Sequence, residues 1–143
     1  MKDLYRLLQF GEERWSIPYE ASNANWKVGL LQYMPQFSYK NLNNIDAHME
    51  TDEIFILQSG KCSLLIFDGK HNADEVKFVH LRKIVPVCVN KETWHTHILS
   101  KDAKVVVIEN ANTCDKNTSV YYFDSDEKKI LAKLAIENQC DYD

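Results

Sequence analysis

The stretch HMETDEIFILQSG at residues 48–60 is the part of the sequence whose residue types most clearly suggest chemistry. A histidine and three carboxylates precede an apolar run with the composition of a buried strand, and the run stops at Gly60. Charged residues at the head of a buried strand either face solvent or converge on a common group. Imidazole and carboxylate together are a normal ligand set for a divalent transition metal, so a metal site is the obvious candidate.

The candidate ligands follow from the period of a strand, in which residues two apart share a face. Asp46 therefore points the same way as His48, and His95 the same way as His97. Glu53 can turn back toward His48 if the residues between them form a bend. We therefore predict that His48, Glu53, His95 and Asp46 bind a metal. His97 is a spare imidazole that could act as a ligand, as a proton-transfer group or as a support for the ligands.

Each assignment has a plainer structural alternative. His48 and His95 could bond nearby backbone carbonyls, and a strand-edge aspartate such as Asp46 is often simply solvated. Glu50 and Asp52 are expected to be solvated residues of the bend. The sequence leaves both interpretations open.

Composition and charge narrow the classes of protein. A chain of 143 residues is predicted to form a single domain over residues 1–143. Apolar residues make up 45% of the chain, which indicates a globular protein, and the net charge of −4 without a long basic run argues against nucleic acid as a partner. No apolar run approaches the roughly 18 residues of a transmembrane helix, so no membrane partner is expected.

The N-terminus and the cysteines point to the cytoplasm. The sequence begins without the apolar segment of a secretion signal. Four cysteines are widely spaced and include no C-x-x-C pair, so we expect free thiols that act as small packing residues in a reducing compartment. The prediction is a cytoplasmic protein.

Most of the chain has the pattern of short strands, about seven to nine of them, and this number is typical of a sandwich or barrel. Residues 3–9 are expected to form helical turns, and Ser59-Gly60-Lys61 predicts a hairpin. The last segment predicts a helix over about 126–138, with Ser125 as its N-cap and an apolar stripe at helical spacing. The expected strands are 26–34, 37–49, 53–58, 61–67, 76–89, 94–100, 104–111 and 119–124.

At these residues the sequence resembles the cupin superfamily. The first cupin motif ends with a histidine, a glutamate and a glycine, and here His48 is followed by four residues, Glu53, six residues and Gly60. The second motif often ends in tryptophan-histidine, as NKETWH does at 90–95. The resemblance covers about residues 26–112. It implies an all-β jelly-roll barrel with a metal held inside its mouth.

The departures from the motifs carry expectations of their own. Asp46 replaces the first motif histidine, and an oxygen ligand there favours iron, manganese or zinc over copper. Asn90 and Glu92 replace the proline and glycine of the second motif, whose opening glycine falls at Ile84. Because a left-handed glutamate would be strained, we predict that the turn is rebuilt with negative φ at Glu92.

Two functions remain open. One is a metal-dependent enzyme acting on a small organic acid or a sugar-derived metabolite. The other is a non-catalytic small-molecule-binding or structural cupin with a vacant site. Strand parity predicts a largely apolar pocket, with Phe55 and Leu57 beside Glu53 and with Leu30, Gln32 and Met34 facing them.

The apolar character of both faces of several strands predicts a homodimer. Outward-facing residues of a small barrel need cover, and we place Ile54, Ile56, Leu64 and Ile66 among them. The C-terminal helix can cover one sheet, and the N-terminal leucines can shield part of the other. We therefore expect a two-fold interface through a sheet.

Overall fold

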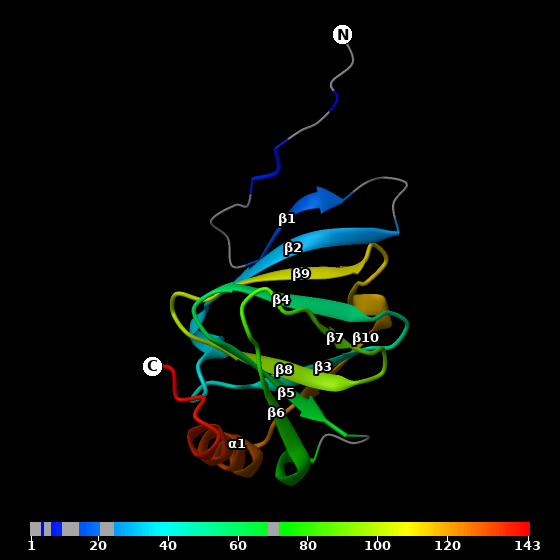
Figure 1. Cartoon of the computed structure of the whole chain (residues 1–143). Helices are drawn as coiled ribbons and strands as arrows, with labels where there is room; N and C mark the ends of the chain where they lie inside the picture. The colour runs from blue at the N-terminus through cyan, green and yellow to red at the C-terminus, as the bar shows by residue number, and fades with distance from the viewer. Residues whose placement is uncertain (1–3, 5–6, 10–14, 21–24, 69–71) are drawn as a thin grey trace.

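A computed structural model describes residues 4, 7–9, 15–20, 25–68 and 72–143, and Figure 1 shows two layers of strands with a helix beneath one of them. Sheet A has the spatial order β1 (Trp15–Glu20), β2 (Trp26–Gln32), β9 (Lys104–Asn110), β4 (Glu53–Ser59) and β7 (Val87–Val89). Sheet B has the order β10 (Thr118–Tyr122), β3 (Asn44–His48), β8 (Trp94–Leu99), β5 (Cys62–Phe67) and β6 (Val76–His80). The predicted all-β jelly-roll architecture with a C-terminal helix is confirmed.

A single apolar core lies between the two sheets. Leu57 on β4 and Val105 on β9 enter it from sheet A, and Leu64 on β5 and Leu99 on β8 enter it from sheet B, each with at most 3% of its surface exposed. Fully burying such a side chain stabilises a fold by roughly 1.5–3 kcal/mol. This core fixes the distance between the sheets and hence the shape of the space at the end where the predicted ligands lie.

The helix α1 (Ser125–Glu137) covers the outer face of sheet B (Figure 1). Leu131 and Ala135 are completely buried, in a second apolar cluster that includes Leu65 on β5 and Ile98 on β8. Strands β5 and β8 therefore pack on both faces, which explains their continuous apolar sequences.

The helix begins one residue earlier than predicted. Asp124, rather than Ser125, is the N-cap, because its carboxylate accepts hydrogen bonds of 2.9 Å from the backbone N–H groups of Asp126 and Glu127. Glu127 in turn accepts from the backbone N–H of Asp124, which completes a capping box. An aspartate accepts such bonds at least as well as a serine, so the correction concerns position and leaves the helix prediction intact.

The predicted hairpin at Ser59-Gly60-Lys61 is wrong. β4 pairs with β9 and β7, whereas β5 pairs with β8 and β6, so the chain crosses from one sheet to the other at this turn. Gly60 is required there, since its φ is 69° and a Cβ would lie 2.6 Å from the backbone of Ala103. A tight turn specifies a reversal of direction but not the sheet to which the next strand belongs.

The prediction that Ile54, Ile56, Leu64 and Ile66 lie on the outer faces of the sheets is wrong for the two residues on β5. Leu64 is completely buried in the inner core and Ile66 packs against that core, because β5 directs its even-numbered residues toward sheet A. Ile54 and Ile56 do lie on the opposite face of β4 from Phe55 and are half-buried. The parity of β5 was ambiguous because both of its faces are apolar.

Several other elements differ from the prediction. β1 was missed, and of the strand expected over 37–49 only β3 (Asn44–His48) is strand, while a 3₁₀ turn over 35–37 overlaps its expected start. The expected helical turns at 3–9 lie partly outside the described residues, and Leu4, Leu7 and Leu8, which were expected to shield a sheet, are exposed.

All four cysteines are free, but only two are buried, so the packing role predicted for Cys88 and Cys114 is wrong. No helix among the described residues is long and apolar enough to cross a bilayer.

Glu92 contradicts the prediction of negative φ, since its φ is 64°. Its backbone N–H donates to the carbonyl of His48 at 2.7 Å, and the N–H of Thr93 donates to the carbonyl of Asn90 at 3.3 Å. Positive φ at the third residue of a turn closed in this way is the type II geometry that normally takes glycine. Ile84, at the other glycine position of the motif, also has positive φ, at 60°. The backbone thus keeps the shape of the motif although the side chains have changed.

Candidate metal centre

The three residues predicted as principal ligands come from three strands in two sheets. His48 ends β3 and His95 lies near the start of β8, both in sheet B, whereas Glu53 begins β4 in sheet A. Residues 49–52 carry the chain across the gap between the sheets, so the predicted bend exists. One donor atom from each residue lies within 4.8 Å of the other two. The structure thus brings these residues together, and their role as ligands stays a prediction.

A single carboxylate oxygen joins the group. Glu53 Oε2 lies 3.2 Å from His48 Nε2 and 3.0 Å from His95 Nε2. The side chains of all three residues are largely buried, with at most 15% exposed. The arrangement is therefore fixed by packing rather than by mobile surface side chains.

The other ring nitrogens determine which tautomer each histidine adopts. His95 Nδ1–H donates to the carbonyl of Thr93 at 2.9 Å. His48 Nδ1 lies 2.8 Å from the hydroxyl of Thr118, and that hydroxyl donates its own proton to the carbonyl of Cys114 at 2.8 Å. The Thr118 oxygen must therefore accept from His48 Nδ1–H. In the neutral form, both histidines present an Nε2 lone pair to the same carboxylate oxygen.

Two lone pairs facing a carboxylate repel unless a cation lies among them. A proton on one Nε2 supplies that cation in the absence of a metal. Burial lowers the pKa of His48, but the hydrogen bond and charge of Glu53 outweigh burial and raise it above its ordinary value of 6.5. Burial likewise opposes ionisation of Glu53, yet hydrogen bonds from His48 and His95 hold the pKa of that carboxyl at about 2. Electrostatics therefore favours positive charge at the centre of the group.

The donor set fits a divalent transition metal. Two neutral imidazole Nε2 atoms and one carboxylate are ligands that iron, manganese and zinc all accept. The Nδ1–H bonds to Thr93 and Thr118 are of the kind that orients metal-binding histidines. The observed N···O separations are also close to the roughly 3.0–3.4 Å expected between two ligand atoms that share one ion.

Asp46 and His97 lie beside this group but are not members of it. Asp46 is on the same face as His48, as predicted, and it faces His95 across the β3–β8 pair. Its carboxylate accepts a 3.1 Å hydrogen bond from Asn44 Nδ2, and burial raises its pKa. His97 packs against Phe37, with 4.3 Å between the ring centroids. Within the part of the chain that the structure describes, only His48, Glu53 and His95 meet the geometric requirement for a metal site.

A cavity of about 920 Å³ opens over the three residues, within the range of small-molecule sites. Phe55 lines it, as predicted, but the residues from β2 are Lys27 and Leu31, not Leu30. The predicted register of β2 was wrong by one residue, because an apolar run at residues 28–31 hides the alternation of the strand. Polar side chains on the other walls include Asn41, Asn44, Asp46 and Asp115.

Sequence reasoning missed a buried ion pair in this cavity. Lys27 Nζ lies 3.3 Å from Glu109 Oε1 and donates to the carbonyl of Thr113 at 2.9 Å. Burial, followed by the charge of Glu53, raises the pKa of Glu109. The available signal was a lysine and a glutamate inside two predicted strands, but the predicted register of β2 turned Lys27 outward.

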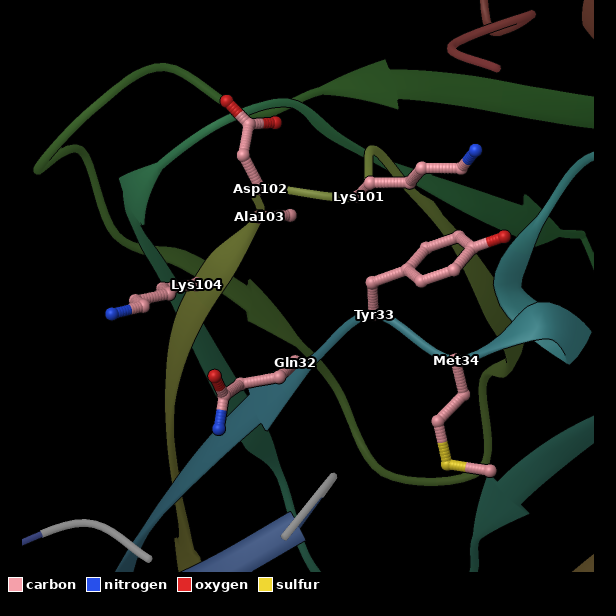
Figure 2. A pocket seen from close by; sticks show the side chains of 7 residues that line it. All are labelled: Gln32, Tyr33, Met34, Lys101, Asp102, Ala103 and Lys104. Carbon is pink, nitrogen blue, oxygen red and sulfur yellow. The ribbon is translucent and has the colours of Figure 1, made fainter. Parts of the chain in front are cut away.

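A second hollow, of about 420 Å³, lies away from this site, and Gln32, Tyr33 and Met34 line one side of it (Figure 2). Residues 101–104 line the opposite side, and Figure 2 shows Asp102 and Lys104 extending away from the tyrosine ring. Gln32 and Met34, predicted to face Glu53, Phe55 and Leu57 across the pocket, thus line this hollow instead. None of the predicted metal ligands lies in it.

Comparisons with known proteins identify the fold. No protein-family model matches the sequence, and no curated protein matches it significantly. A variant of Streptomyces PAC13 with uridine is similar in structure, with a TM-score of 0.60 and 8% identity over 90% of this chain and 98% of that one. Another structure of Pac13, described as a unique nucleoside dehydratase, gives a TM-score of 0.59 and 8% identity over 87% and 95% of the two chains. A protein from Planctomyces limnophilus gives 0.52 and 10% identity over 86% and 97%.

At these low identities the comparisons establish architecture only. The chain has the cupin fold, as the motif resemblance predicted. One structural neighbour, Pac13, is described as a nucleoside dehydratase and was solved with uridine, and a fold alone does not specify a reaction.

Proposed function

We propose that this protein binds a divalent transition metal (iron, manganese or zinc) through His48, Glu53 and His95, and that it binds a small polar organic molecule beside the metal. The observation that carries the proposal is the convergence of two Nε2 lone pairs, each fixed by an Nδ1–H bond, on one carboxylate oxygen. Asp46 lies on the same face and is a candidate fourth ligand.

The chemistry of the site follows from what such a metal supplies. A bound divalent ion polarises a carbonyl or carboxylate group or lowers the pKa of a bound water. Glu53 and the two histidines hold that charge inside the cavity, and Phe37 and Phe55 exclude water from one side. His97, two residues beyond His95 on the same strand, lines the cavity and is our candidate for moving a proton to or from a bound molecule.

The proposed ligand is a small metabolite such as an organic acid or a sugar derivative. Support comes from the cavity volume of about 920 Å³ and from its mixture of apolar and polar walls. A structural neighbour, Pac13, was solved with uridine, which supports a small polar ligand for this architecture. Catalysis is an extension of the proposal that turnover assays of candidate metabolites would test.

A second function is favoured by one specific feature of the site. The N···O distances of 3.0 and 3.2 Å also lie within the range of N–H···O hydrogen bonds, so protons can take the place of the metal. In that case the protein binds a small molecule at a metal-free histidine–glutamate centre. The metal content of the protein separates the two functions.

We further propose that the protein is cytoplasmic and forms a homodimer through the outer face of sheet A. Ile54 and Ile56 on β4, with Val106 and Ile108 on β9, form a half-buried apolar strip on that face, whereas α1 covers sheet B. A symmetric interface of at least about 1,000 Å² would cover the strip. Sedimentation at tens of micromolar should show a dimer, and a monomer under those conditions would refute this part of the proposal.

Elemental analysis tests the proposal most simply. Protein purified without an affinity tag or added metal should contain close to one equivalent of iron, manganese or zinc. The double variant His48→Ala/His95→Ala should lose that metal while its circular dichroism is unchanged. His80→Ala, which alters an exposed histidine on β6, is the matched control and should keep the metal. Substoichiometric metal in the wild type, or equal metal in the double variant, would contradict the proposal.

A further inference from the structure

Lys27 and Glu109 form a second charged group in the cavity, separate from the candidate metal ligands. Lys27 on β2 pairs in register with Glu109 on β9, and Glu109 pairs in register with Glu53 on β4. All three side chains point inward and line the cavity, and both residues of the pair are at least 91% buried. A row of one cation and two anions therefore crosses sheet A.

The ion pair is not needed to hold its strands together. β2 and β9 are paired in register over seven consecutive positions, from Trp26 with Asn110 to Gln32 with Lys104. Burying a lysine and a glutamate costs several kcal/mol of desolvation, which their attraction repays only in part. A buried charge pair on a cavity wall is therefore a better candidate for ligand recognition than for stability.

The pair retains hydrogen-bonding capacity toward the cavity. Within the described residues, Lys27 uses two of its three N–H donors, one for Glu109 and one for the Thr113 carbonyl. Glu109 accepts from Lys27 through Oε1, and within the same described residues Oε2 makes no hydrogen bond. A donor on Lys27 and an acceptor on the Glu109 carboxylate thus lie side by side, held by the 3.3 Å contact between Nζ and Oε1.

Charge determines which ligand group suits this pair. Four carboxylates and one lysine line the cavity, so an anionic group approaching Lys27 would meet Glu109 and Glu53 at close range. A cationic group would meet the Lys27 ammonium. A neutral group avoids both penalties, and it satisfies both partners if it presents an acceptor next to a donor.

We propose that Lys27 and Glu109 recognise a neutral planar edge in which a carbonyl lies beside an N–H, as in an amide, a ureide or a cyclic imide. The carbonyl accepts from Lys27 Nζ, and the N–H donates to Glu109. This inference rests on the proposed function, since it specifies the class of molecule that lies beside the candidate metal centre. The pair acts in recognition and orientation, and it makes no bond to the metal.

Binding of matched probes tests the inference. Uracil and hydantoin each carry the proposed edge, and their fully N-methylated forms keep the carbonyls but lack the N–H donors. Calorimetric titration of the wild-type protein should show at least one parent compound binding about tenfold or more tightly than its methylated form. Butyrate, an anion of similar size, should bind more weakly than that parent compound.

The variant Lys27→Met/Glu109→Met removes both charges together, which leaves no unpaired buried ion and preserves the fold. It should bind the parent and methylated probes with equal, weak affinity. Lys104→Met, the same change at an exposed position of β9, should retain the wild-type preference. A preference that survives in the double variant, a wild-type protein that binds none of the probes, or stronger binding of butyrate would each overturn the inference. Metal content measured in the same samples distinguishes this failure from failure of the metal proposal, because the double variant should retain wild-type metal.

Discussion

Two rows of inward-facing residues cross the same three strands of sheet A. One row, Lys27–Glu109–Glu53, is charged, and the other, Leu31–Val105–Leu57, is apolar and at most 5% exposed. The inward-facing residues of sheet B also change from polar to apolar along β8, from His95 to the buried Leu99.

The strands are continuous, so the backbone is the same at both ends and only the side chains differ. The end of the inter-sheet space that contains the apolar row stabilises the fold. The end that contains the charged row forms the candidate site. The two rows lie four positions apart along each strand, which is enough to keep the contributions to stability and to binding largely independent.

The largest expected effect follows from a change in the apolar row. Leu57→Ala removes a side chain that is 3% exposed and should lower the free energy of unfolding by about 2–5 kcal/mol. Metal content per folded molecule should not change. Urea unfolding monitored by fluorescence measures the first quantity, and Ile56→Ala, on the half-buried outer face, should cost less. Loss of metal in folded Leu57→Ala would show that the two rows are coupled.

Metal binding at the charged end of the space should depend on Thr118, which contacts the far nitrogen of His48. Thr118→Val removes the hydroxyl that accepts from His48 Nδ1–H, while keeping the volume of the side chain. We expect metal affinity to fall by about 10- to 100-fold, because the imidazole loses the partner that fixes its tautomer. Thr118→Ser keeps the hydroxyl and should bind metal as the wild type does. Competition with a chromogenic chelator gives both affinities, and equal values for the two variants would argue against this orientation of His48.

A rise in pH should lower the stability of the metal-free protein but increase the stabilisation that a bound metal provides. The pKa of His48 is raised in the folded protein, so its stabilising contribution is fully present below 6.5 and is lost as pH rises through the folded-state value. The pKa of Glu53 is lowered from 4.5 to about 2, so its contribution is present above 4.5 and is lost as pH falls toward 2. The two contributions coincide between about pH 4.5 and 6.5.

Metal-free protein should therefore become less stable as pH rises from 6 to 8. A metal competes with the proton for His48 Nε2, so the stabilisation that added metal provides should increase over the same range. Thermal melts with and without manganese at several pH values measure both trends. Parallel curves would indicate that metal and protons do not share the site.

The smallest effect concerns the turn beside the site. Glu92 has φ of 64°, and Glu92→Gly relieves a conformation that L-residues disfavour, so it should raise stability by about 0.5–1 kcal/mol. Lys91→Gly, at a neighbouring position of the same turn without positive φ, should lower it. Equal effects of the two changes in urea unfolding would argue against strain at Glu92.

The same comparison explains what could be predicted from the sequence. His48, Glu53 and His95 were predicted because strand parity and the spacing of two short motifs, His48–Glu53–Gly60 and Trp94-His95, indicated a shared site. The faces of β5 could not be assigned, since Leu64 packs between the sheets while Leu65 packs with α1, and both are completely buried. Alternation carries no information where a strand is covered on both sides.

The other misses have similar physical causes. Lys27 is 82 residues from Glu109 and 86 residues from Thr113 in the sequence. Only the strand order of sheet A therefore reveals that Lys27 meets Glu109. The positive φ of Glu92 occurs in a turn whose backbone bonds to the carbonyl of His48, and local propensity disfavours that φ for glutamate. Long-range pairing, rather than local sequence, determined each of these features.

Diffraction data collected at the absorption edges of iron, manganese and zinc would test the central claim most directly. The proposal predicts one anomalous peak within roughly 2.0–2.2 Å of His48 Nε2, His95 Nε2 and a Glu53 carboxylate oxygen. A well-ordered site that contains no anomalous scatterer in metal-supplemented crystals, with the Glu53 hydrogen bonds to both histidines intact, would contradict it.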